Sequence, residues 1–137
     1  MIRNLVHDPM LLAIPSQPAT KADAAAGQDL LDTLNAHRET CVGMAANMIG
    51  IRKRIIVFID GGKAVLMYNP EITAKAVPFE TEEGCLSLLG DPRKTTRWQQ
   101  ITVRFQDSRF QQKTMRFQGF TAQIIQHEID HCNGVLI

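Results

Sequence analysis

Residues 119–132 read GFTAQIIQHEIDHC, and this stretch decides how the chain is expected to fold. The pattern predicts a helix from about Phe120 to Cys132. His127 and His131 stand four positions apart, so both imidazoles lie on one helical face and can reach the same metal ion. An ordinary exposed pair of histidines is the alternative, but Glu128 in the second position favours a metal site. We therefore expect a metal-binding helix here.

A catalytic metal site needs a third protein ligand and one open position. No His, Asp or Glu follows His131, so the ligand must come from upstream. Residues 82–87 read EEGCLS, and Cys85 follows a glycine and two carboxylates, a setting that poorly suits a buried hydrophobe. Cys132 points about 100° away from His131 around the helix. Cys41 lies in a glycine-rich strand and is interpreted as a packing residue, which leaves Cys85.

The rest of the chain predicts antiparallel strands ahead of the metal-binding helix. Two runs rich in β-branched residues flank Gly61-Gly62, which is typical of a hairpin. Strands first and the decisive helix last indicate an α+β fold, with small antiparallel β-sheets packed around the C-terminal metal-binding helix. The expected elements are a helix to about residue 37, strands over 41–50, 54–60, 63–68, 101–106 and 114–117, and an exposed charged loop over 91–97.

Length and charge exclude several classes of protein. The 137 residues predict a single domain, 1–137, and a net charge of +1 argues against non-specific binding to nucleic acid. The apolar runs are far shorter than the roughly 20 residues that cross a bilayer. Three cysteines, an odd number, indicate free thiols or metal ligands rather than disulfides. We expect a cytoplasmic protein with no membrane contact.

Three segments, taken together and in this order, resemble the peptide deformylase family: CVGMAANMIG at 41–50, EGCLS at 83–87 and QHEIDH at 126–131. The resemblance implies a hydrolase that removes the N-formyl group from the initiator methionine of nascent peptides. Its usual ion is Fe²⁺, and a thiolate ligand also suits Zn²⁺, Ni²⁺ or Co²⁺. It implies a monomer or weak dimer. The resemblance also suggests the ribosome as a partner. Some relatives dock on it through a C-terminal segment that this sequence, ending at Ile137, is not expected to provide, so this partner stays an open question.

The resemblance also implies a role for each residue of the site. Cys85, His127 and His131 would hold the ion, and Glu128 would move the proton of the attacking water. The backbone N–H of Leu86 would donate to the developing oxyanion. The substrate would contact Val42, Gly43, Gly84, Phe120, Gln123 and Ile124, while Glu83 and Arg97 would support the ligands.

Two positions of the first segment depart from the family pattern: Cys41 stands where the family has a glycine, and Met48 is the departure that bears on activity. Met48 stands where the family has a glutamine whose side chain donates to the oxyanion, and methionine has no N–H donor. Asn47 is adjacent, but neighbours on a strand face opposite sides. We therefore expect normal metal binding with reduced activity. The alternatives are a silent deformylase paralogue that binds peptide N-termini or a protein partner, and an endopeptidase of the two-histidine-plus-glutamate type.

Overall fold

The computed structural model describes residues 1–88 and 90–137. Within them lies a five-stranded antiparallel sheet with the strand order β1-β2-β3-β4-β5. The α+β class is confirmed, and the two predicted hairpins belong to this one sheet. The elements are α1 (Pro9–Leu12), η1 (Lys21–Asp23), α2 (Ala24–Ala36), β1 (Gly43–Ala45), η2 (Ala46–Ile49), β2 (Ile55–Asp60), β3 (Lys63–Glu83), β4 (Arg93–Gln106), β5 (Gln112–Gln118) and α3 (Gly119–Cys132).

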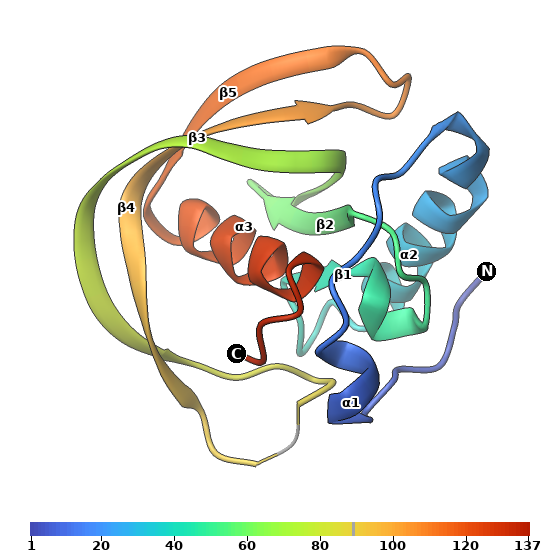
Figure 1. Cartoon of the computed structure of the whole chain (residues 1–137), viewed down its shortest axis with the longest axis horizontal. Coiled ribbons are helices and arrows are strands. Elements are labelled where there is room, and N and C mark those ends of the chain that lie inside the picture. The colour runs from blue at the N-terminus through green and yellow to red at the C-terminus, as the bar shows by residue number, and fades with distance from the viewer. Residues whose placement is uncertain (89) are drawn as a thin grey trace.

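The long strands β3 and β4 arch around α3 (Figure 1). Their pairing register shifts twice, between Tyr68 and Glu71 and between Ile72 and Ala74, and such bulges bend a strand. Asn69 lies at the first shift with a φ of 53°, a conformation that asparagine tolerates better than most residues. Its Oδ1 accepts a hydrogen bond from the Ala19 N–H at 2.7 Å, which fixes the bend.

Strand β2 supplies both halves of the core, because successive side chains of a strand point to opposite faces. Ile56 and Phe58 belong to the buried cluster beneath α3. Ile55 and Val57 belong to a second buried cluster that includes α2 residues. All four side chains are fully buried, which explains why this strand reads as a continuous apolar run.

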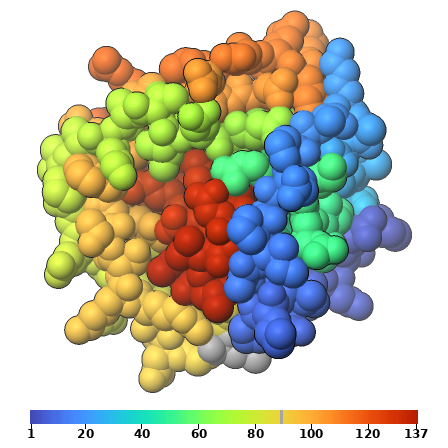
Figure 2. Space-filling view, in the orientation of Figure 1, coloured from blue at the N-terminus to red at the C-terminus, as the bar shows by residue number. Residues whose placement is uncertain are grey.

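Two isoleucines of helix α3 help to pack it on the sheet. Ile125 and Ile129 lie in the cluster that contains Phe58 of β2. His127 and His131 are offset from these isoleucines by two positions, so they project from another side of the helix. The C-terminal part of the chain reaches the surface between the long strands and the N-terminal segment (Figure 2). The core contact thus orients the two imidazoles.

Two expectations for local structure are wrong. The strand expected over 41–50 covers only Gly43–Ala45, and residues 46–49 form the 3₁₀ helix η2, which is capped by Gly50 with a φ of 83°. Residues 93–97 of the exposed loop expected over 91–97 are instead the start of β4. Arg97 there pairs with Phe79 of β3 and is buried, with 4% of its surface exposed. Arg97 forms a buried ion pair with Glu83, which stabilises its charge in the interior.

Candidate metal centre

A cavity of about 540 Å³ lies beside the first turns of α3. Three parts of the chain that are distant in sequence form its walls. They are residues 40–43 with Met48, residues 82–86 with Leu88 and Gly90, and Phe120, Gln123, Ile124, His127 and Glu128 of α3. Every residue that the sequence analysis assigned to substrate contact lines this cavity.

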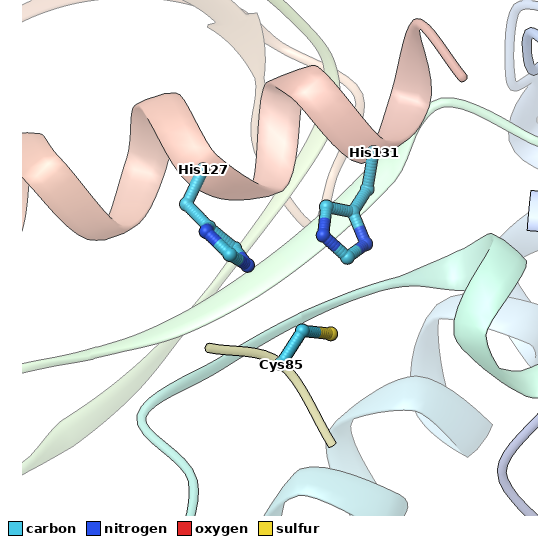
Figure 3. Close-up of side chains that lie close together, drawn as sticks. All are labelled: Cys85, His127 and His131. Carbon is cyan, nitrogen blue, oxygen red and sulfur yellow. The ribbon is translucent and has the colours of Figure 1, made fainter. Parts of the chain in front are cut away.

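Cys85, His127 and His131 converge on one point, with one potential ligand atom from each lying within 4.8 Å of the others. Figure 3 shows the two imidazoles projecting from α3 toward the segment that carries Cys85. The ring centroids of the histidines are 4.7 Å apart. One thiolate and two imidazoles are a donor set that suits a borderline or soft divalent ion. The three side chains therefore fit a metal ion.

Each imidazole is oriented by a hydrogen bond of its own. Nδ1 of His127 donates to Oε1 of Glu83 at 2.8 Å, which leaves its Nε2 lone pair for an ion. Nε2 of His131 donates to the carbonyl oxygen of Ile137 at 3.2 Å. Burial lowers the pKa of His131, so this ring is neutral near pH 7, as a ligand must be.

Glu83 is the centre of a buried hydrogen-bond network. Its carboxylate accepts from Nη2 of Arg97 at 2.7 Å and from Nε2 of Gln123 at 2.9 Å, in addition to His127. Burial would raise the pKa of Glu83, but these donors outweigh it and lower the pKa to about 2. Arg97 also donates to Asp130 at 2.6 Å. The carboxylate is therefore ionised and held by several donors against the ring of His127, a candidate ligand.

Replacing Glu83 with alanine is expected to weaken metal binding by about 10–100-fold, because His127 loses the acceptor that orients it. It also leaves Arg97 buried with only Asp130 as its acidic partner, so the free energy of unfolding should fall by about 3 kcal/mol. Competition with a chelator and urea unfolding measure the two effects. Glu80→Ala removes an exposed carboxylate from the same strand and should change stability by less than about 0.5 kcal/mol. Equal effects of the two variants would contradict this role.

Glu128 lies in the cavity wall beside the ligands and is 4% exposed. Its Oε1 is buried and has no hydrogen-bond partner among the described residues. Burial raises the pKa of Glu128 to about 7. A carboxyl group poised near neutrality can both accept and release a proton, as general acid–base chemistry requires.

Met48 is buried and its side chain reaches the cavity. Its sulfur accepts a long hydrogen bond, 3.4 Å, from the backbone N–H of Ala45. Asn47 cannot replace the missing donor, because its Nδ2 donates to the carbonyl oxygen of His131 at 2.9 Å. Asn47 therefore points away from the cavity as expected, although it lies on a 3₁₀ helix rather than on a strand.

The competing cysteines lie outside the ligand group. Cys132 is buried in the core beneath α3. Cys41 is only partly buried and lines the cavity, and its thiol donates to the carbonyl oxygen of Gly43 at 2.9 Å. Burial raises the pKa of Cys41 to about 11, which keeps the thiol protonated.

Sequence reasoning missed several residues of the site, Asp130 and Leu88 among them. Asp130 of α3 accepts a hydrogen bond from Arg97. It lies three positions after His127, on a neighbouring face of the helix, and this spacing is the signal in the sequence that could have identified it. Leu88 lines the cavity, and no pattern in the sequence distinguishes it from a core leucine.

Within the described residues, no helix is both long and apolar enough to cross a membrane. The family model described as Polypeptide deformylase matches residues 3–137. A peptide deformylase of Clostridium beijerinckii is 53% identical over the full length of both chains. The crystal structure of a peptide deformylase from Legionella pneumophila is 32% identical, has a TM-score of 0.88, and is matched over 99% of this chain and 83% of that one. A class I type b peptide deformylase from Acinetobacter baumannii, crystallised with Met-Ala-Ser bound, is 26% identical and has a TM-score of 0.88. The match covers 99% of this chain and 97% of that one. These matches favour a deformylase over a silent paralogue, and the chain belongs to the peptide deformylase family.

Proposed function

We propose that residues 1–137 act as one domain that removes the formyl group from the N-terminal methionine of nascent peptides in the cytoplasm. One divalent ion would be held by Cys85, His127 and His131. The observation that carries the proposal is that these three side chains converge beside a cavity lined by Glu128, whose buried Oε1 has no hydrogen-bond partner in the described part of the chain. A ligand set and a base on one cavity wall suit hydrolysis of a small amide.

The family is metal-dependent, and Fe²⁺ is the ion that we propose here. The thiolate of Cys85 also suits Zn²⁺, Ni²⁺ and Co²⁺. When bound, the ion supplies Lewis-acid chemistry: it lowers the pKa of water and polarises the formyl carbonyl.

Glu128 moves the proton. Its carboxylate takes a proton from the water that attacks the formyl carbon, and then gives it to the departing nitrogen when the carbon–nitrogen bond breaks. Formate and a free amino terminus are the products. The raised pKa of Glu128, about 7, matches both halves of this transfer.

The free edge of the sheet positions the peptide. β1 pairs with β2 and lies at the end of the strand order, so its other edge can accept an extended peptide beside Val42 and Gly43. Gly84 lies in the wall beside the ligands, and the backbone N–H of Leu86 would donate to the formyl oxygen. The side chain of the first residue would enter between Phe120, Gln123 and Ile124. The relative from Acinetobacter baumannii binds Met-Ala-Ser, which supports this assignment.

Met48 limits the rate in this proposal. The backbone donor of Leu86 and the ion remain, but the side-chain donor that glutamine supplies in relatives is replaced by a thioether. Contact with the ribosome and a monomeric or weakly dimeric state stay predictions.

The test is hydrolysis of formyl-Met-Ala-Ser by protein loaded with Fe²⁺ under anaerobic conditions. Release of formate above the rate of the chelator-treated protein is expected. Formate release that does not depend on the ion would contradict the proposal.

Replacing Gly43 with alanine is expected to slow the reaction by about 100-fold, because a misplacement of about 1 Å near the reacting group has that effect. A Cβ atom at this position would lie 2.7 Å from Cγ2 of Ile124 and 2.9 Å from Oε2 of Glu128, so the carboxylate must move. Formate release and metal content are measured together, and metal content should not change.

Gly84→Ala is the matched control, since a Cβ there meets no atom of residues 1–88 or 90–137 within 4 Å. It should lose much less activity than Gly43→Ala. Similar losses in the two variants would show that crowding of Glu128 is not the cause.

A further inference from the structure

Gln123 connects the cavity to the network that orients the metal ligands. It lies on α3 one turn before His127, and both side chains donate to Glu83: Gln123 Nε2 to Oε2 at 2.9 Å, and His127 Nδ1 to Oε1 at 2.8 Å. An ionised carboxylate can only accept hydrogen bonds, so the NH₂ end of the amide must face Glu83. The network therefore fixes which way the Gln123 amide is turned.

Gln123 is also part of the cavity wall. Its neighbours there, Phe120 and Ile124, present only apolar atoms to a side chain that enters the cavity. The amide nitrogen carries two hydrogens, and the bond to Glu83 uses one of them. The second N–H belongs to an amide held in one orientation beside the apolar side chains of Phe120 and Ile124, and it can donate to an acceptor atom of the substrate's first side chain.

We propose that Gln123 is a specificity-determining residue, which recognises methionine by donating its second N–H to the thioether sulfur of the substrate. The proposal rests on the deformylase function proposed above. The methionine sulfur is a weak acceptor on an otherwise apolar side chain, so it can satisfy the donor while the rest of the chain fills the apolar wall. Norleucine has the same length but a methylene in place of sulfur, and it offers the donor nothing.

The experiment compares formyl-Met-Ala-Ser with formyl-norleucyl-Ala-Ser. Wild-type protein should favour methionine in kcat/KM by about three- to tenfold, the range of one modest hydrogen bond. Gln123→Met keeps the length of the side chain and removes the donor. The ratio of kcat/KM for the methionine peptide to that for the norleucine peptide should therefore fall to about one, or below one because a methylene is more apolar than sulfur. The ratio does not depend on the fraction of protein that carries metal, since both substrates meet the same preparation.

Phe120→Leu is the matched control, because it changes the same wall without removing a polar atom. It should alter both substrates alike and keep the wild-type ratio. Gln123→Met should retain its metal, because Oε2 of Glu83 still accepts from Nε of Arg97 at 3.1 Å. A wild-type ratio near one, or an unchanged ratio in Gln123→Met, would overturn the proposal.

If the protein is not a deformylase, the experiment gives a result that differs from failure of the Gln123 proposal. In that case no variant releases formate from either peptide, and the same comparison is made by calorimetry with the peptides Met-Ala-Ser and norleucyl-Ala-Ser. The Kd ratio should again favour methionine in the wild type and be lost in Gln123→Met. A Kd ratio that Gln123→Met leaves unchanged, or binding of neither peptide, would overturn the role of Gln123.

Discussion

Glu128→Gln is expected to lower kcat for formyl-Met-Ala-Ser by about 10²–10⁴-fold, the usual contribution of a general acid–base group. The amide has the same shape as the carboxyl group but cannot take up the proton of the attacking water. Glu128 is buried beside the ligands with one oxygen free of partners among the described residues, so the substitution breaks no hydrogen bond of that oxygen. Formate release measures the loss.

Metal content is the control for Glu128→Gln. It should equal that of the wild type, because Glu128 is not one of the three side chains whose ligand atoms converge. A variant that keeps its metal and hydrolyses the peptide at the wild-type rate would show that another group moves the proton.

Met48→Gln is expected to raise kcat by about 10–10³-fold, since a single oxyanion donor is worth about 10²–10³ in turnover. Glutamine and methionine have similar length, so the buried site can accept the change. The Ala45 N–H that now donates to the Met48 sulfur can donate to the glutamine carbonyl oxygen instead. That contact would hold the amide, whose NH₂ group then serves as the missing donor.

Met48→Leu separates the donor from the change of side chain. Leucine also removes the thioether but adds no N–H, so its kcat should stay near that of the wild type. An equal gain in both variants would mean that the thioether itself inhibits the reaction. No gain in either would mean that Met48 does not limit the rate.

The sequence predicted helix α3 well because the spacing of the two candidate histidine ligands matches the period of a helix. Histidines four positions apart lie on one face, while Ile125 and Ile129, each two positions before a histidine, reach the core. Cys85 could be chosen by elimination, since only three cysteines exist and the other two had simpler explanations. The structure brings Cys85, which follows β3, together with the two histidines of α3 (Figure 3).

The long curved strands could not be predicted in the same way. β3 reads as exposed and polar over much of its length, so no alternating pattern marks it beyond Tyr68. Arg97 shows the same limit: within a run of charges it reads as surface, and only the pairing of β3 with β4 places it against Glu83. Local sequence carries no signal for contacts that depend on the register of distant strands.

Anomalous X-ray diffraction from crystals of the metal-loaded protein tests the central claim most directly, because it locates the ion without reference to activity. We predict one peak, about 2.0–2.4 Å from Sγ of Cys85 and from one ring nitrogen each of His127 and His131. A peak that lies away from Cys85, or metal-loaded protein with no peak beside the two histidines, would contradict the account.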